Sequence, residues 1–136
     1  MEYEGLYSIF NSSMIKTYPF SQRSNKVGFS DLLTPEQVLD TKYSLPEDTL
    51  QTVDILADHI VSARAQGKPV ICFTGAHSIK NGFGRLLADL VRKDLLTLVA
   101  GNAATSIHDF ELALFGQTGE YVPQALEKGQ FGMAFE

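Results

Sequence analysis

The clearest alternation of apolar and polar positions begins at Glu47. Pro46 and the two acids after it are typical of a helix start, and Gly67 followed by Pro69 is typical of a stop. Between them, apolar residues recur at spacings of three and four: Leu50, Val53, Leu56, Ala57, Ile60 and Val61. This stripe predicts an amphipathic helix.

Two short apolar runs follow, over residues 69–74 and 95–100, and each predicts a buried strand. Helical segments alternate with these runs, and this order favours an α/β fold with a parallel sheet and right-handed crossovers. Two strands leave sheet edges open and one face poorly covered. We therefore expect a sheet that is incomplete in this chain and is the first part of a larger, doubly wound one.

Each predicted strand leads through small residues into a helix. Residues 75–84 are expected to form a loop, with a helix from Gly84 to about Asp94. After the second strand, Ser106 and Asp109 have the spacing of a capping box, and the helix is expected to end at Phe115, before Gly116.

The two ends of the chain are patterned less clearly. Residues 1–46 contain three prolines and no clean periodicity, which indicates an arm rather than a self-contained core, with a short helix from Thr34 to about Thr41. Residues 47–136, which contain the alternating helices and strands, are expected to be the first part of the domain that the sheet forms. A last short helix is expected from near Tyr121 to Gly129.

Composition narrows the possible functions. The chain has 136 residues, 44% of them apolar, with 11 basic and 16 acidic side chains and a net charge of -5. These values predict a single globular domain with an arm and argue against a nucleic-acid partner. One cysteine, an acidic N-terminus and no apolar run near the roughly 20 residues of a membrane span favour a cytoplasmic location, without an export signal or membrane contact.

The loops that follow the two strands are the expected ligand site. In open parallel sheets, ligands bind beyond the carboxyl ends of the strands, where small residues let them approach the backbone and helix N-termini favour anions. These properties indicate nucleotide binding. The alternative is a pair of ordinary strand-to-helix turns, because the first loop has no G-x-G-x-x-G sequence and the chain has no Walker sequence.

Three side chains near these loops are candidates for polar contacts. His77 lies in the first loop, and His108 and Asp109 lie at the start of the following helix. A metal site built from the three is conceivable, but no recognised ligand spacing supports it, so no metal is predicted. Glu111 is expected to point elsewhere, and Lys80 is either a phosphate contact or a solvated loop lysine.

At these loops the sequence resembles a known family. Gly75-Ala-His-Ser-Ile-Lys80 and Ile107-His-Asp-Phe-Glu111 are similar to motifs of the deoxyhypusine synthase family, especially its bacterial deoxyhypusine-synthase-like branch. Phe131-Gly-Met133, Thr17-Tyr-Pro19 and residues 23–27 add support, and the likeness covers about residues 16–136. It implies a Rossmann-like NAD-binding fold, assembled as a homotetramer, that takes a hydride from spermidine and transfers its aminobutyl group to an amine acceptor.

The resemblance also implies which residues contact NAD. The family's contacts correspond to residues of the two loops and of the helix start: Gly75, His77, Ser78, Asn102, Ala103, Ala104, His108 and Asp109. His108 takes the place of an acidic residue of the synthases, and Asp109 keeps an adjacent acid. Ala104 and Thr105 replace glycines of the synthase loop.

The family's imine-forming lysine, and most of its spermidine-binding acids, lie in the second half of a longer chain. No lysine here matches the catalytic one, so we predict no catalytic residue in these 136 residues and no transfer by this chain alone. Two hypotheses remain. One is the N-terminal part of an NAD-dependent aminobutyl transferase; the other is a non-catalytic nucleotide-binding or oligomeric assembly module.

Overall fold

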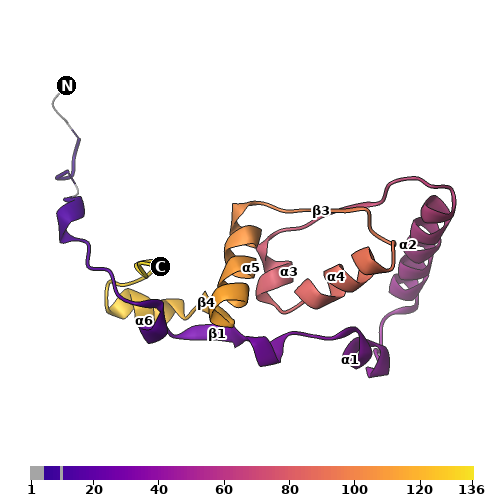
Figure 1. Ribbon diagram of the computed structural model, residues 1–136, viewed down its shortest axis with the longest axis horizontal. Coiled ribbons are helices and arrows are strands. Elements are labelled where there is room, and N and C mark those ends of the chain that lie inside the picture. The colour runs from indigo at the N-terminus through magenta and orange to yellow at the C-terminus, as the bar shows by residue number, and fades with distance from the viewer. Residues whose placement is uncertain (1–4, 10) are drawn as a thin grey trace. The chain divides into compact units, whose positions relative to one another are not determined.

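The computed structural model describes residues 5–9 and 11–136, which form two compact units (Figure 1). The strand unit comprises Val27–Gly119. The terminal unit comprises the residues up to Lys26 together with Glu120–Glu136. Both helices and strands are present, so the chain is mixed α and β, as the sequence pattern predicts.

The centre of the strand unit is a parallel pair of strands, β2 (Ile71–Phe73) and β3 (Leu98–Ala100). Their residues pair in order, beginning with Ile71 opposite Leu98. Helix α4 (Gly84–Arg92) lies between them in sequence and connects them. The predicted parallel pairing and the predicted crossover helix are both confirmed. The strands are shorter than the apolar runs that predicted them.

Two predictions about the helices around this pair are wrong. The segment after β2, expected to be a loop, contains the short helix α3 (Ala76–Lys80), because Gly75 begins a helical turn directly after the strand. Helix α5 (Ala103–Phe115) begins before the expected capping box, because the side chain of Asn102 caps it. Its predicted end is confirmed: Gly116 closes it with φ 70°.

The amphipathic helix predicted from the apolar stripe is α2 (Glu47–Ala65). Arg64 anchors its C-terminal end to the turn before β3: its guanidinium donates to the Asp94 backbone oxygen at 2.8 Å and to the Asp94 carboxylate at 2.7 Å. None of the helices within the described ranges combines the length and the apolar content that crossing a bilayer requires.

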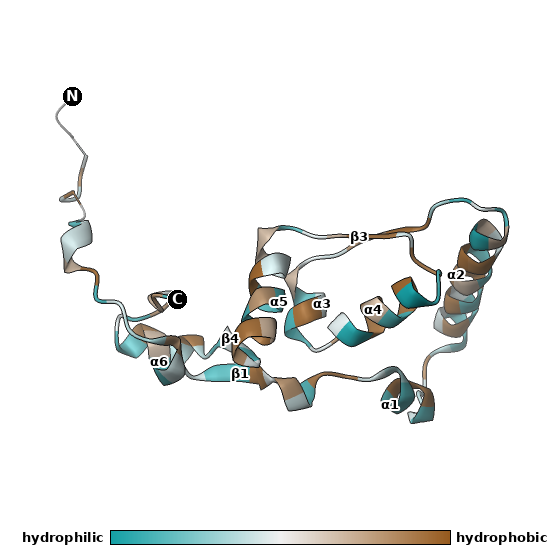
Figure 2. Cartoon of the chain, in the orientation of Figure 1, coloured by the Kyte–Doolittle hydropathy of each residue, from teal (hydrophilic) through white to brown (hydrophobic). Residues whose placement is uncertain are grey.

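A small apolar cluster holds the strand unit together. Leu32, Ile79 and Leu112 are buried against one another, and Val27 and Leu87 pack around them. Helices α3 and α5 therefore meet through Ile79 and Leu112, and this contact holds the two helices that follow β2 and β3 against each other. Figure 2 shows hydrophobic segments along the strand pair and on the helices that surround it.

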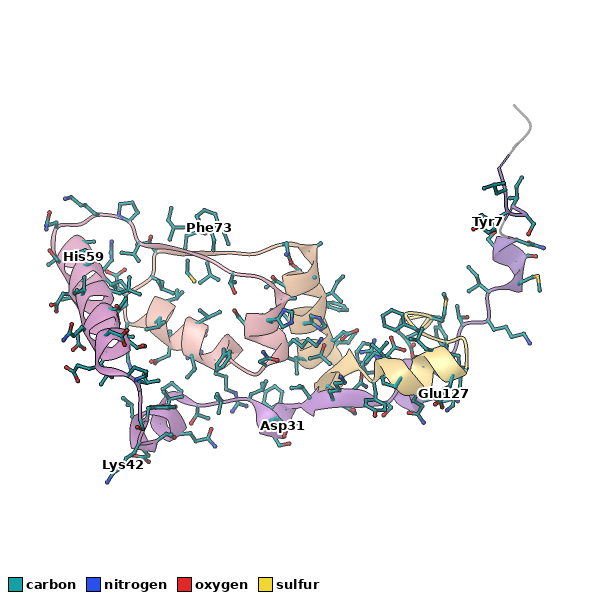
Figure 3. The ribbon with its side chains drawn as sticks, turned by 180° about the vertical axis from the view of Figure 1, so that it is seen from behind. Tyr7, Asp31, Lys42, His59, Phe73 and Glu127 are labelled. Atoms are coloured by element: carbon teal, nitrogen blue, oxygen red, sulfur yellow. The ribbon has the colours of Figure 1, made fainter. Side chains whose placement is uncertain are left out.

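One face of the strand pair is open to solvent. The side chain of Phe73 is 81% exposed and those of Ile71 and Leu98 are about half exposed, whereas the alternate residue Cys72 is partly buried. Figure 3 shows Phe73 on the side of the strands away from α4. Because successive residues of a strand point to opposite faces, helix covers one face of this sheet and the other is bare.

Shorter elements complete the chain. Helix α1 (Pro35–Asp40) has the predicted Thr34 cap, completed by Gln37 as a capping box. Strands β1 (Asn25–Gly28) and β4 (Gln117–Glu120) form a second two-stranded sheet that the sequence pattern did not predict. Single 3-10 turns lie at Ser12–Met14, Phe20–Gln22 and Phe29–Asp31.

The terminal unit brings together residues from the two ends of the chain. Helix α6 (Val122–Glu127) forms where the last short helix is predicted. The hydroxyl of the buried Tyr18 donates to the Glu120 carboxylate at 2.8 Å, and the Gly132 N–H donates to the same carboxylate at 2.9 Å. Two backbone bonds add to this link: the Tyr18 N–H donates to the Met133 oxygen, and the Phe135 N–H donates to the Tyr18 oxygen.

Candidate functional site

The two predicted ligand loops begin side by side at the carboxyl ends of β2 and β3. Phe73 pairs with Ala100, and the next backbone N–H, that of Thr74, donates to the Ala100 oxygen at 2.8 Å. Gly75 therefore starts the first loop directly beside Gly101 and Asn102 of the second. This is the edge at which open parallel sheets bind ligands.

The backbone at the start of the first loop is accessible to a ligand. Gly75 is exposed, and a Cβ placed on it would meet no other heavy atom within 4 Å. Packing within the chain thus gives no reason for a glycine at this position. His77 on α3 is exposed as well, whereas Ser78 is partly buried and its hydroxyl shares a short hydrogen bond with that of Thr74.

The second loop is held by a helix cap. The carboxamide oxygen of Asn102 accepts from the backbone N–H of Thr105 at 3.1 Å and from its hydroxyl at 3.2 Å. Ala103 and Ala104 form the exposed first turn of α5. Gly101 is required by this geometry, because a Cβ there would lie 2.9 Å from the Thr105 side chain.

Together, the loops offer exposed small residues and the N-terminus of a thirteen-residue helix whose first turn contains no acid. Free N–H groups and the dipole at such an end attract anions. The five-residue α3 has too short a dipole to add much. The open space before Gly75 and the methyl-sized side chains of Ala103 and Ala104 fit close approach of a dinucleotide pyrophosphate to the backbone.

The remaining two predicted site residues, His108 and Asp109, face different surroundings. Asp109, with Thr105 and Ser106, lines a largely apolar cavity of about 430 Å³ between α4, β3 and α5. His108 is only partly exposed, and its ring meets Thr118 of β4. The structure therefore does not bring all of the predicted residues to one surface: six lie at the ends of β2 and β3 or in the helical turns that follow, and His108 and Asp109 lie further along α5.

Sequence reasoning missed two partners of His108. Nδ1 of His108 lies 2.7 Å from the Thr118 hydroxyl, which donates to the Glu111 carboxylate at 2.5 Å. The Glu111 carboxylate is itself 3.9 Å from Nδ1. Residues three apart share a helix face, so the spacing of His108 and Glu111 was a usable signal. The position of Thr118 depends on strand β4 after Gly116, and no local pattern indicated that strand.

Two further candidates from the sequence were Lys80 and a metal site. Lys80 ends α3 and is partly buried. Within residues 5–9 and 11–136, no three or more His, Cys, Asp and Glu side chains come close enough together to hold a metal ion.

Comparisons with known proteins give no match to this chain among protein-family models, curated proteins or solved structures. The resemblance to deoxyhypusine synthases accordingly rests on the motifs at the two loops.

Proposed function

We propose that this chain is the N-terminal part of a deoxyhypusine-synthase-like, NAD-dependent transferase. Its reaction would move an aminobutyl group from a polyamine such as spermidine to an amine acceptor. The observation that carries the proposal is the meeting of the two family-like segments, Gly75–Lys80 and Ile107–Glu111, through α3 and α5 beside one end of a parallel strand pair.

The proposal includes a Rossmann-like fold for the complete domain. The order β2, α3, α4, β3, α5 supports this, because strands and helices alternate in such domains, and their ligands bind beyond the carboxyl ends of the strands, where the two loops begin. The bare face around Phe73 is a reason to expect more strands or helices in the complete sheet, because parallel sheets are covered on both faces.

NAD would lie over the two loops. Gly75 and Ala103 would let its pyrophosphate approach the backbone, and the N-terminus of α5 would stabilise its charge. Asn102 would keep that end of the helix in place through its cap on Thr105. When bound, NAD supplies the acceptor for a hydride from the polyamine.

Aminobutyl transfer itself needs other residues than those that would bind NAD. An amine that attacks the oxidised substrate must be unprotonated and positioned at the reacting carbon. Lys80 ends a short helix, and nothing in its surroundings gives it that role. We therefore propose that this part binds the cofactor and that the transfer chemistry belongs to the remainder of the protein.

The test uses the natural gene product that contains residues 1–136. Calorimetry measures NAD binding, and absorbance follows the NADH formed when spermidine is added. We expect NAD binding and spermidine-dependent reduction of NAD. Failure of NAD to bind contradicts the proposal. Binding without any reduction of NAD restricts the function to nucleotide binding.

The exposed apolar residues favour the second hypothesis, an oligomeric assembly module. Phe73 on the strand pair and four α2 residues (Val53, Ile55, Leu56, Val61) are each more than half exposed. Such surfaces are typical of association sites. We propose that they are covered by self-association, in a homotetramer if the family resemblance holds. A gene product that assembles but does not bind NAD favours this module over the transferase.

A further inference from the structure

A groove lies in the terminal unit between residues from the two ends of the chain. It has a volume of about 300 Å³ and is lined by residues 14–16 and by residues 128–130 with Met133. This volume is at the lower end of the range for ligand pockets. The groove, called the terminal groove below, therefore has room for a few side chains of an extended segment and not for a folded domain.

The backbone around the terminal groove is held in place by hydrogen bonds of the chain itself. Gly129 follows α6 with φ 63°, and the Gln130 N–H donates to the Ala125 oxygen at 2.8 Å. The Tyr18 N–H donates to the Met133 oxygen at 3.2 Å, which ties the N-terminal lining segment to the C-terminal one. Both lining segments are thus fixed before a ligand arrives, which lowers the entropic cost of binding.

The lining of the terminal groove combines apolar and basic side chains. Met14 and Ile15 are exposed, and Met133 is partly buried. Lys16 and Lys128 are exposed as well, and neither forms an ion pair within residues 5–9 and 11–136. The lining residues that the structure describes include no acid, although the chain as a whole has a net charge of -5. The complementary occupant is a segment that is both apolar and acidic.

The N-terminal segment (residues 2–9) has this composition. It contains Glu2 and Glu4, no basic residue, and the apolar Leu6, Tyr7 and Ile9. The side chain of Leu6 is 97% exposed, and those of Tyr7 and Ile9 are both more than two thirds exposed. None of these three side chains lines the terminal groove of its own chain. Uncovered apolar surface of this kind is typical of an interaction site.

We propose that the N-terminal segment of one copy docks in the terminal groove of a second copy. Leu6 and Tyr7 would lie against the apolar lining, and the two acids of the segment would lie near the two lysines. This inference goes beyond the self-association proposed above, which concerns Phe73 and α2 of the strand unit, and it does not depend on NAD binding.

The N-terminal segment can be exchanged reciprocally between copies. In a dimer with two-fold symmetry, each copy provides one segment and one groove, so the contact is made twice. Burial of Leu6 and Tyr7 would supply most of the affinity, because ion pairs between exposed side chains contribute little. The ion pairs would instead select this segment and make its docking sensitive to salt.

Photo-crosslinking of the full chain tests the docking directly. Tyr7 is replaced by p-benzoylphenylalanine, which inserts into nearby C–H bonds on irradiation, and this chain is mixed with an equal amount of ¹⁵N-labelled wild type. Mass spectrometry shows which copy carries each cross-link. We expect cross-links to Met14 or Met133 of the ¹⁵N-labelled copy. The same photolabel at Leu39, which is similarly exposed in the strand unit, is the control and should not reach these methionines.

Reversal of the charges gives a second measurement. Lys16→Glu with Lys128→Glu in the ¹⁵N-labelled copy should lower the cross-link yield about threefold or more, as the loss of two exposed ion pairs implies. Glu2→Lys with Glu4→Lys in the photolabelled copy should then restore the yield toward that of the wild type, because the opposite charges face each other again.

The matched control for the charge reversal is Lys42→Glu with Lys68→Glu. It changes the net charge by the same amount at exposed lysines of the strand unit and should leave the cross-link yield unchanged. Equal losses from the two pairs of variants would show that only net charge matters, and this result would overturn the placement of the acids beside Lys16 and Lys128.

The outcomes separate this proposal from the others. Cross-links confined to the photolabelled copy, or no more cross-linking than from Leu39, overturn docking between copies. Oligomers that form without these cross-links also overturn it and favour the surfaces of the strand unit. Loss of NAD binding in calorimetry contradicts the proposed transferase and leaves the docking of the N-terminal segment intact.

Discussion

The backbone N–H of Thr74 donates to the oxygen of Ala100 at 2.8 Å, one residue beyond the last strand pair. This bond extends the hydrogen-bond ladder between β2 and β3 up to the residues at which the two strands end. It therefore determines that the loops at Gly75 and Asn102 start as neighbours. Any ligand that spans the two loops depends on this alignment.

Ala103→Phe should weaken NAD binding to the gene product at least about tenfold, which corresponds to about 1.4 kcal/mol. The phenyl ring would occupy the space in front of the first turn of α5, where Ala103 is exposed. Calorimetry measures the affinity. Ala57→Phe, on the exposed surface of α2, is the matched control and should bind NAD as the wild type does. An unchanged affinity in Ala103→Phe would remove this loop from the site.

Asn102→Ala should lower the free energy of unfolding by about 1 kcal/mol, since it removes an N-cap. The carboxamide oxygen of Asn102 accepts from the Thr105 N–H, and alanine leaves that donor without its cap. Asn102→Asp should stay close to wild type, because a carboxylate accepts the same bond and suits the helix N-terminus. Urea denaturation followed by circular dichroism measures both. Equal losses in the two variants would show that the cap is not what stabilises this turn.

Lys80 should form no covalent adduct with a polyamine. The 136-residue chain, incubated with labelled spermidine and NAD and then treated with borohydride, should trap no label and produce no NADH. Lys80→Arg should behave identically in both measurements. Label on Lys80 together with NADH formation would place the transfer chemistry in this half of the site.

Stability at alkaline pH should depend on Tyr18. Burial and the bond to Glu120 raise the pKa of Tyr18 from 10.0 to about 12. The folded state thus favours the neutral phenol, and its stabilisation is complete below about pH 10 and is lost as the pH rises through 12. The free energy of unfolding of the wild type should therefore fall more steeply between these values than that of Tyr18→Phe.

The control for this pH effect is Tyr43→Phe, because Tyr43 is 61% exposed. It should keep the wild-type dependence in denaturant titrations at each pH. If Tyr18→Phe and Tyr43→Phe give the same slope, the Tyr18 phenol does not carry the effect.

Phe73 should contribute to self-association. Its side chain is exposed on the bare face of the strand pair, and burying it against a second copy would remove apolar surface from water. We expect the chain to sediment as an oligomer and Phe73→Lys to shift it toward monomer. Leu39→Lys, at the similarly exposed Leu39, is the control. A dilute wild-type monomer that melts cooperatively would contradict this expectation.

The elements that could be predicted from the sequence are those with a strong local pattern. The apolar stripe of α2 and the alternation of strand, helix and strand around α4 are visible within short windows. Helix α3 was missed because five residues are too few to show a period. The start of α5 was placed too late because Ser106 and Asp109 have a capping spacing, while Asn102 makes the actual cap.

The part of the candidate site that could not be predicted depends on contacts distant in sequence. Strand β4 is short and rich in polar residues, so its alternation is weak, and its pairing with β1 joins segments far apart along the chain. Burial of Thr118 follows from that pairing. No local rule could therefore place Thr118 beside His108, whereas the spacing of His108 and Glu111 and the two loops can be recognised in the sequence.

The link between Tyr18 and the last residues of the chain has a consequence for the order of folding during synthesis. Tyr18 bonds to Met133 and Phe135, and the Phe20 N–H donates to Glu136, 116 positions later. Contacts this distant form slowly, because a long loop must close first. On the ribosome, the strand unit can assemble as soon as Gly119 has emerged, whereas the N-terminal segment must wait for Glu136. Until then, Tyr18 and Phe20 remain exposed to chaperones and to other nascent chains.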